Sequence, residues 1–219
     1  MQAKNELELK QQMVDVAHIL AESGLISSSD GNISVKVERD RFLATPSGLY
    51  KRTMGVDDII VVDVDGEFLE GRSGLQPTSE IKMHMEVYRQ RADVEAVLHA
   101  HPPYAVALTI AEIPFPVHLI PEVLLALGDV PTAEYATPGT QDLAWSIRAL
   151  VRDHDAMLLS HHGSLTVGKT LTEALIALER LEAAARTYYL AHGLGTPVPL
   201  PEVELERLRA LRRRMSETQ

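Results

Sequence analysis

Apolar residues recur every three or four positions at the start of the chain. Within residues 6–23 they are Leu9, Met13, Val16, Ala17 and Leu20, and Gly24 follows. This spacing is typical of an amphipathic helix that turns one stripe toward a core, and a glycine after the last turn favours a helix C-cap. The pattern therefore predicts an opening helix over residues 6–23.

After this helix the chain turns to short runs of β-branched and aromatic residues separated by turn residues. We expect one strand over residues 33–38 and a second in RFLATPSG, residues 41–48, which ends in a turn. The stretch DIIVVDVDGEFLEG predicts a β-hairpin about Asp65 and Gly66. Asp63, Asp65 and Gly66 lack the other ligand positions of a calcium loop, so we interpret them as turn residues.

The rest of the chain alternates helical and strand patterns without a regular period. Thr78 and Ser79 are candidate N-caps of a helix of about three turns with Ile81, Met85 and Tyr88 on one face. The remaining expected elements are, in chain order, a strand over 94–101, a helix over 102–111, a short strand or loop over 115–131, a helix capped by Thr140 that carries Leu143, Ile147 and Leu150, two short strands over 156–168, and a long helix that starts with a capping box of Thr170 and Glu173 and ends at Gly193.

This order of elements bounds the fold class. Hairpins among the strands and irregularly placed helices favour an α/β fold, with a mixed sheet layered between helices, over a regular parallel barrel. The chain has 219 residues, of which 45% are hydrophobic, and both values are ordinary for one globular domain. We therefore expect one domain over residues 1–200 and a C-terminal helical tail over residues 201–219.

Composition and charge exclude several classes of partner and site. The chain has no cysteine, so it has neither a disulfide framework nor a thiolate metal site, which suits a cytoplasmic location. The formal net charge of −10 disfavours nucleic acid, because a phosphate backbone is repelled. We expect neither a signal peptide nor a membrane span, since no run approaches about eighteen apolar residues. The basic segment ERLRALRRR, residues 206–214, indicates a solvated terminal helix or one that docks on a neighbouring subunit.

Two pairs of histidines stand at the ends of apolar runs. In AVLHAHPPYA, His99 and His101 lie on the same face of a predicted strand, about 6.5 to 7 Å apart along the chain. In LLSHHGSLTVG, His161 and His162 are neighbours at a strand-to-turn junction, so at most one of them is expected to face the same pocket. Three neutral imidazoles with an open fourth position are typical of a catalytic zinc site. Together the clusters favour a metal centre, although each one alone is also explained by hydrogen bonds to the backbone.

A carboxylate and two turn-rich loops complete the candidate chemistry. We expect Glu80 in the first turn of its helix, with Ser79 as N-cap, where the helix dipole stabilises a carboxylate by about 0.3–1 kcal/mol. That local effect is by itself a sufficient reason for a glutamate there. The loops SSSDGNIS and TPSG are ordinary turn sequences when taken singly, but they carry the side-chain and backbone donors that a phosphate nest needs.

Taken in order, the segments SSSDGNISVKV, LATPSG, QPTSEIKMHMEVYRQRADVEAVLHAHPPYA, YATPGT and LLSHHGSLTVG resemble the class II aldolase and adducin-like family, most closely its fuculose-1-phosphate aldolase type. The resemblance spans about residues 7–192. It implies a three-layer α/β/α sandwich around a mixed, largely antiparallel sheet. It also implies a homotetramer whose active sites lie at subunit interfaces.

The resemblance further implies roles for individual residues. His99, His101 and His162 match the zinc ligands, and manganese, cobalt and iron remain alternatives because nitrogen ligands do not select among these metals. Glu80 matches the acidic residue that binds the resting metal and acts as the acid and base. The residues that match the substrate phosphate site are Ser29, Asn32, Ser47, Gly48, Thr78 and Ser79.

The implied activity is zinc-dependent cleavage of a ketose 1-phosphate, similar to L-fuculose 1-phosphate, to dihydroxyacetone phosphate and an aldehyde through an ene-diolate held by the metal. A metal-dependent decarboxylase or dehydratase of a related sugar phosphate is the alternative, and a non-catalytic interaction domain like the adducin head is a third reading. Two positions depart from the aldolase pattern, since Leu119 replaces a tyrosine and Pro138 replaces an aromatic residue. His118, Tyr135 or a C-terminal residue of another subunit are the candidates for the second acid.

Overall fold

The structure is a computed structural model that describes residues 6–216. The strands are β1 Asn32–Glu38, β2 Arg41–Ala44, β3 Ile60–Val62, β4 Phe68–Glu70, β5 Ala96–Ala100, β6 Thr132–Ala133, β7 Ala156–Leu159 and β8 Gly163–Gly168. The α-helices are α1 Glu6–Glu22, α2 Ile81–Gln90, α3 Pro103–Ile110, α4 Pro121–Leu127, α5 Gln141–Ser146, α6 Leu171–Leu194 and α7 Glu202–Ser216. Short 3-10 helices lie at Lys51–Thr53, Val56–Asp58 and Leu150–Arg152.

The strands form one open sheet in the order β4-β3-β2-β1-β5-β8-β7-β6. Neighbouring strands run antiparallel, except that β6 and β7 run parallel. The sheet is therefore mixed and largely antiparallel, as predicted. Strand β5 lies at its centre, where His99 is opposite Asn32 of β1 on one side and opposite Leu165 of β8 on the other.

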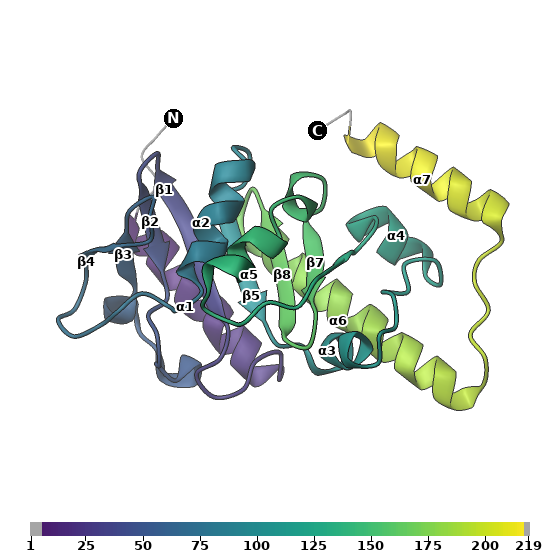
Figure 1. Cartoon of the computed structure of the whole chain (residues 1–219), viewed down its shortest axis with the longest axis horizontal. Coiled ribbons are helices and arrows are strands. Elements are labelled where there is room, and N and C mark those ends of the chain that lie inside the picture. The colour runs from purple at the N-terminus through teal and green to yellow at the C-terminus, as the bar shows by residue number, and fades with distance from the viewer. Residues whose placement is uncertain (1–5, 217–219) are drawn as a thin grey trace.

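Side chains that alternate along the central strands pack into separate cores on the two faces of the sheet. Ile33, Val35 and Leu98 face α1 and the first half of α6, whereas Val62 and Val97 face α2 and α5. A period of two is expected for strands that are buried on both faces. Helices α3, α4 and α6 enclose a third apolar cluster against β7. The sheet thus lies between two helical layers, which confirms the three-layer α/β/α sandwich (Figure 1).

Two parts of the predicted element list are wrong because the local signals were misread. The stretch 115–131 contains the helix α4 and not merely a short strand or loop. Pro121 occupies its first turn, where a missing N–H costs nothing, and seven residues are too few to show a helical period. Ser79 is not the N-cap of α2, since that position is occupied by Glu80, and no side chain caps the helix.

The ends of two other helices also differ from the prediction. Thr140 caps α5 as expected, but the helix ends at Ser146 and Leu150 lies in a separate 3-10 turn. Helix α6 passes through Gly193 and ends at Leu194, because the Ala191 carbonyl still accepts the N–H of Gly195 at 3.0 Å. The Thr170 hydroxyl caps α6 as predicted, but the Glu173 carboxylate accepts the N–H of Lys169 and so does not close the expected capping box.

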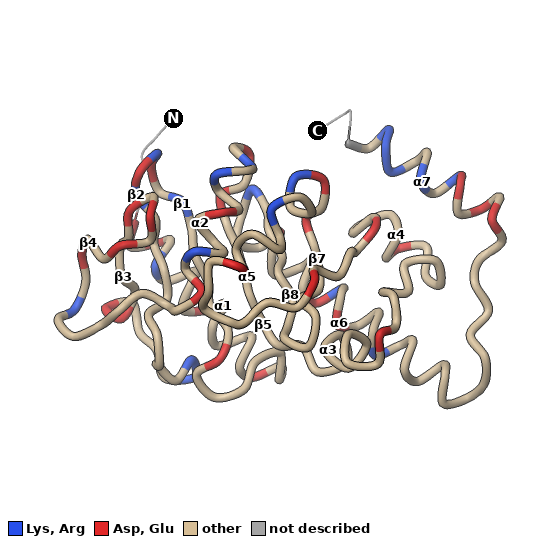
Figure 2. The backbone as a smooth tube through the Cα atoms, in the orientation of Figure 1, with Lys and Arg blue, Asp and Glu red and all other residues tan. Residues whose placement is uncertain are grey.

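The C-terminal helix α7 packs against α4 of the same chain. Leu205 is buried, and Nη1 of Arg212 donates to the Leu125 and Ala126 carbonyls at 2.6 and 2.7 Å. Gly128, at φ +66°, leaves room for this guanidinium, since a Cβ there would lie 2.7 Å from Nε of Arg212. Acidic residues occupy the start of α7 and basic residues its end (Figure 2). Within residues 6–216 no helix is both long and apolar enough to cross a membrane.

Candidate metal centre

Three histidines meet at the end of the central strands β5 and β8. His99 is the fourth residue of β5 and is fully buried, and His101 follows the strand just before the first turn of α3. His162 lies in the turn between β7 and β8. Gly163 permits this arrangement, because a Cβ there would lie 2.9 Å from the rings of both His99 and His101. The glycine thus lets the hairpin close against the imidazoles.

The imidazole rings of these three residues are in mutual contact. Their centroids lie 4.7 to 5.0 Å apart, and each ring offers one nitrogen such that the three atoms lie within 4.8 Å of one another. Nε2 of His99 lies 2.9 Å from Nε2 of His101. The Glu80 carboxylate joins them, with Oε2 at 3.1 Å from Nε2 of His99 and Oε1 at 3.2 Å from Nε2 of His162. These four side chains therefore converge on one point.

The placement of protons shows that the residues fit a metal ion. Nδ1 of His99 lies 2.9 Å from the Ser164 carbonyl oxygen, which can only accept a hydrogen bond, so Nδ1 carries a proton. In the neutral ring the other nitrogen, Nε2, then has a free lone pair. That bare nitrogen faces a carboxylate oxygen. Oε1 of Glu80 is buried without a hydrogen-bond partner. A divalent cation among these lone pairs would satisfy all of them, and three imidazoles with a carboxylate suit Zn²⁺.

The electrostatics keep these ligands in the protonation state that a metal needs. Burial lowers the pKa values of His101 and His162 to about 4, and the neighbouring imidazoles add to the effect, so both are neutral at pH 7. Burial alone would raise the pKa of Glu80, but the adjacent His99 and the hydrogen bond from Asn32 outweigh it and hold the pKa well below its ordinary value. Neutral imidazoles and an ionised carboxylate are the forms that bind divalent metals.

We expect the metal-free protein to lose stability as the pH falls from about 6.5 to about 4. His84, His101 and His162 have pKa values of about 3, 4 and 4 when folded, against 6.5 when exposed. The unfolded chain therefore binds more protons in this window, and the free energy of unfolding rises with pH. Denaturant unfolding at several pH values, on protein freed of metal with a chelator, measures how the free energy of unfolding changes with pH. The slope gives the number of protons taken up on unfolding, and in His84→Gln this number should fall by about one. An unchanged slope would contradict the low pKa assigned to His84.

The structure keeps His161 away from the cluster. Its backbone adopts φ +55°, its N–H donates to the Thr109 hydroxyl at 3.0 Å, and its exposed ring faces Tyr135 with centroids 6.5 Å apart. His162 is thus the member of the pair that lies with His99 and His101, as the sequence interpretation assumed. The roles of all these residues remain predictions at this point.

The residues predicted to hold a phosphate lie in three neighbouring loops. A β-bridge joins Pro46 to Pro77, and the N–H of Ser47 donates to the Gln76 carbonyl at 2.9 Å, so the loop with Ser47 and Gly48 lies against the loop with Thr78 and Ser79. Lys51 joins the loop with Ser29 to the loop with Ser47 and Gly48. Ser47, Gly48 and Ser79 are exposed, Ser29 is half-buried and Thr78 is buried. Asn32 differs from the rest, since its buried amide donates to Oε2 of Glu80 at 2.9 Å.

The sequence interpretation did not identify two buried polar residues near these loops. Lys51 is only 2% exposed, and its Nζ donates to the carbonyls of Ser29 and Leu49 at 3.1 and 3.2 Å, which ties two of the loops together. Burial lowers the pKa of this lysine to about 8, partly offset by Asp30. His84 lies completely buried behind Asn32 and Glu80. Its position four residues after Glu80 in a predicted helix was the available signal, since such residues share a face.

The candidates for the second acid lie apart from one another. Tyr135 is 62% exposed and contacts the ring of His161. The carbonyl of His118 accepts the N–H of Leu200 at 3.0 Å, which anchors the segment that leads to α7. Neither His118 nor Tyr135 belongs to the group of side chains that can share a metal ion.

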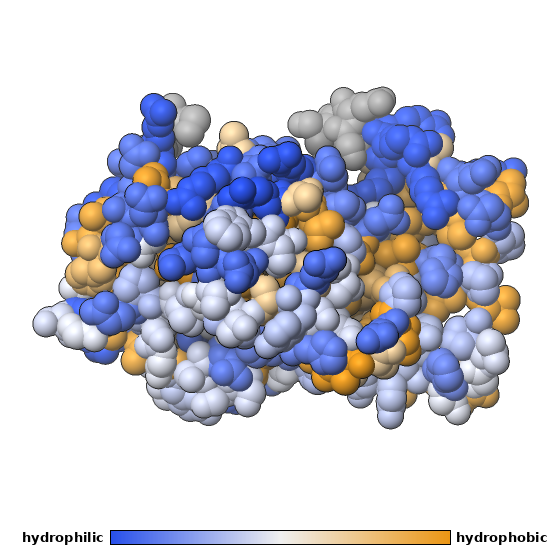
Figure 3. All heavy atoms as spheres, viewed as in Figure 1, coloured by the Kyte–Doolittle hydropathy of each residue, from blue (hydrophilic) through white to orange (hydrophobic). Residues whose placement is uncertain are grey.

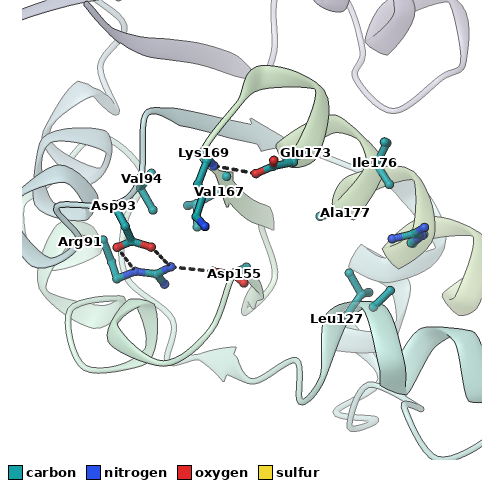
Figure 4. Close-up of a pocket in the computed structure, with 13 residues that line it drawn as sticks. Arg91, Asp93, Val94, Leu127, Asp155, Val167, Lys169, Glu173, Ile176 and Ala177 are labelled. Carbon is teal, nitrogen blue, oxygen red and sulfur yellow. Dashed lines mark hydrogen bonds and ion pairs between the residues drawn. The ribbon is translucent and has the colours of Figure 1, made fainter. Parts of the chain in front are cut away.

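A separate hollow of about 400 Å³ lies at the opposite end of β5 and β8. Val94 precedes β5 and Gly168 ends β8, so this hollow is a strand length away from the histidines. Its side chains largely neutralise one another, since Arg91 pairs with Asp93 and Asp155 at 2.8 and 2.9 Å (Figure 4). Among residues 6–216 the histidine cluster is the group suited to a metal, so it is the candidate site.

Comparisons of the sequence and of the structure with known proteins point to the same family. The sequence profile described as "Class II Aldolase and Adducin N-terminal domain" matches residues 11–189. A 5-methylthioribulose-1-phosphate/5-deoxyribulose-1-phosphate aldolase of Rhodospirillum rubrum is 31% identical over 93% of this chain and 90% of that protein. A 3-oxo-tetronate 4-phosphate decarboxylase of Escherichia coli O6:H1 is also 31% identical, over 86% and 89%. A solved L-fuculose 1-phosphate aldolase superimposes with a TM-score of 0.83 at 34% identity, covering 93% and 95% of the two chains.

Proposed function

The chain belongs to the class II aldolase and adducin family and is a carbon–carbon lyase of the class II aldolase type, and we propose that it cleaves a ketose 1-phosphate to dihydroxyacetone phosphate and an aldehyde with zinc as its metal. The observation that carries the proposal is the cluster of His99, His101, His162 and Glu80, with an orphaned carboxylate oxygen among neutral imidazoles. Manganese, cobalt or iron would fit the same donors.

A bound metal would supply the charge stabilisation that cleavage of the carbon–carbon bond needs. Breaking the carbon–carbon bond leaves negative charge on the oxygens of the three-carbon fragment, and a bound Zn²⁺ would act as a Lewis acid that stabilises this charge. His99, His101 and His162 would hold the ion, because their rings come from the same end of the sheet and can share one metal. Glu80 and a substrate would supply the remaining contacts.

Glu80 is our candidate for the proton carrier. Its carboxylate is 7% exposed and lies within 3.2 Å of two of the ligand nitrogens, so an incoming pair of substrate oxygens would compete with it for the metal. Once displaced, the carboxylate would take up the proton that the substrate hydroxyl loses as the carbon–carbon bond breaks, and as the carboxylic acid it would protonate the carbon of the three-carbon fragment. It would remove the same proton during condensation, and such acid–base catalysis typically contributes about 10²–10⁴-fold.

The substrate phosphate would bind where the three loops meet. Ser29, Ser47, Gly48, Thr78 and Ser79 supply hydroxyl and backbone donors there, and Gly48 has open space around its α-carbon at φ +73°. Asn32 would add one N–H, since its amide nitrogen uses only one hydrogen on Glu80. Lys51 adds a buried cation that contacts both the loop with Ser29 and the loop with Ser47 and Gly48. A dianionic phosphate is thus matched by donors and by one positive charge.

We further propose a cytoplasmic homotetramer in which a neighbouring subunit completes each active site. Hydrophobic residues are visible on the surface at the end of the molecule with α4 and α6 (Figure 3). Leu190 and Leu194 of α6, and Val198 after it, are exposed. Residues 201–219 would form a tail whose face directed away from α4 contacts the neighbouring subunit. Deletion of residues 201–219 that left assembly and turnover unchanged would exclude this role.

A decarboxylase or dehydratase of a related sugar phosphate is the second candidate function. The observation in its favour is that Leu119 and Pro138 replace side chains expected of the fuculose-phosphate aldolase, so the group that would handle the aldehyde oxygen is missing from these positions. The similarity to a protein named as a decarboxylase points in the same direction. A non-catalytic adducin-like role is disfavoured because the three histidines and Glu80 are all present.

Product identification distinguishes these functions. Zinc-loaded protein would be incubated with a panel of ketose 1-phosphates and sugar-acid phosphates, and the products assigned by ¹³C and ³¹P NMR. We expect dihydroxyacetone phosphate and an aldehyde. Carbon dioxide or a dehydrated ketone would instead place the protein among the decarboxylases or dehydratases, and no product from any member of the panel would contradict both.

A further inference from the structure

Behind Glu80 a row of polar side chains runs into the interior of the protein. The row consists of Asn32, His84, Ser34 and Tyr88, which come alternately from β1 and α2. Residues 80, 84 and 88 are four apart and share one face of α2, whereas residues 32 and 34 are two apart and share one face of β1. All four side chains are buried, and His84 and Ser34 are wholly inaccessible.

The hydrogen bonds along this row are short and continuous. Tyr88 Oη lies 2.9 Å from Ser34 Oγ, and Ser34 Oγ lies 2.7 Å from Nδ1 of His84. Nε2 of His84 lies 2.6 Å from Oδ1 of Asn32. The Asn32 amide nitrogen then donates to Oε2 of Glu80 at 2.9 Å. One unbroken chain therefore links a buried phenol to the carboxylate of the metal centre.

The carboxylate at one end of the row and the neutral state of His84 fix the direction of every hydrogen bond. A carboxylate only accepts, so Asn32 must present its NH₂ to Glu80 and its carbonyl oxygen to His84. His84 must then donate from Nε2, and when neutral it must accept at Nδ1 from the Ser34 hydroxyl. Burial lowers the pKa of His84 to about 3, with a smaller contribution from His99, so the ring is neutral at ordinary pH. Ser34 in turn accepts from Tyr88.

We propose that His84 is a positioning residue, which locks the amide of Asn32 so that one N–H holds Glu80 and the other faces the substrate. Without the His84 donor the Asn32 amide would be free to rotate and present its oxygen to the carboxylate, which is repulsive. Asn32 has no second acceptor for its amide hydrogens among the hydrogen bonds of residues 6–216. The substrate-facing part of this inference rests on the proposed function, whereas the hold on Glu80 does not.

A purely structural role does not require this arrangement. A buried imidazole that makes two directional hydrogen bonds is costly if either is lost, whereas an apolar side chain of similar size would fill the same volume without that risk. Residues that orient a metal's ligands typically change metal affinity or activity by about 10–100-fold when they are replaced. The imidazole is thus explained by the orientation that it imposes on Asn32.

Two substitutions of similar size separate positioning from packing. His84→Gln keeps an amide donor near the position of Nε2, whereas His84→Met fills the cavity and offers no donor. Each variant would be loaded with Co²⁺, and the visible absorption spectrum, the Co²⁺ affinity, kcat and KM would be measured beside the thermal midpoint. Thr166→Val is the matched control, since Thr166 is equally buried but its hydroxyl bonds the Ala174 carbonyl in another part of the sheet.

We expect His84→Met to weaken Co²⁺ binding by about 10–100-fold, to alter the cobalt spectrum and to raise KM, with His84→Gln restoring most of each property. Thr166→Val should change only the thermal midpoint. Equal metal affinity and an unchanged spectrum in His84→Met would overturn the proposal, as would equal losses in both folded His84 variants. Should neither variant fold, Ser34→Ala, which removes the donor to Nδ1, must shift the cobalt spectrum or the proposal fails. The cobalt readouts need no turnover, so they remain decisive if the proposed reaction is wrong.

Discussion

The variant His162→Ala is expected to be isolated without a metal ion and to show no metal-dependent turnover. Its ring supplies one of the three nitrogens that lie within 4.8 Å of one another, and its Nε2 lies 3.2 Å from Oε1 of Glu80. Loss of a residue that only orients a metal ligand already lowers metal affinity by about 10–100-fold. Loss of the ligand itself should therefore lower metal affinity by more than about 100-fold. Metal content after dialysis, measured by plasma mass spectrometry, reports this directly.

The neighbouring histidine provides the control for this experiment. His161→Ala removes an imidazole of the same kind one residue away, but that ring faces Tyr135 and is not part of the cluster. We expect this variant to retain one metal ion per chain. If both variants kept their metal equally, or if His161→Ala alone lost it, the assignment of the three ligands would be wrong.

Replacing Glu80 with glutamine is expected to lower kcat by about 10²–10⁴-fold while metal remains bound. Glutamine has the same shape, and its amide oxygen can still accept the N–H of Asn32, but it cannot carry a proton. With metal in excess, the three histidines should keep the site filled even though the metal affinity is lower, so the main loss appears in kcat. Steady-state kinetics and metal analysis on the same sample test the two statements together.

Two results would argue against this role of Glu80. Turnover of Glu80→Gln within a few-fold of the parent protein would show that another group moves the proton. Loss of metal from the variant would show that the carboxylate acts mainly as a ligand. Glu86→Gln is a suitable comparison, since Glu86 is also a buried carboxylate on α2 but pairs with Arg148 and is not part of the cluster.

Much of this fold follows from local sequence patterns. The helix at Glu6–Glu22, the strand at Ala96–Ala100 and the long helix from Leu171 were predictable because each carries a clear apolar period. Helix α4 was not, since seven residues hold too few turns for a period to appear. The position of Glu80 at the N-cap of α2 was also missed, because its side chain turns toward the histidines and does not cap the helix.

Local patterns indicated the histidines of the site, whereas Glu80 and the phosphate-binding residues entered the prediction through the family resemblance. His99 and His101 share a strand face, and His162 next to Gly163 marks a sharp turn, so their types and spacing indicated a metal. The row through Asn32, His84 and Tyr88 depends on β1 and α2 packing side by side, which no local pattern reveals. Lys51 was overlooked for a similar reason, since an isolated lysine is usually exposed and its burial depends on two other loops.

The most direct test of the central claim uses only the three-carbon fragment. Metal-loaded protein would be mixed with dihydroxyacetone phosphate in D₂O, and ¹H NMR would follow hydrogens on the hydroxymethyl carbon. The account predicts that one of the two hydrogens exchanges with solvent, that chelation stops the exchange, and that Glu80→Gln slows it by about 10²–10⁴-fold. Absence of exchange in metal-loaded protein, or exchange at equal rates in Glu80→Gln, would contradict a metal centre at which Glu80 moves the proton.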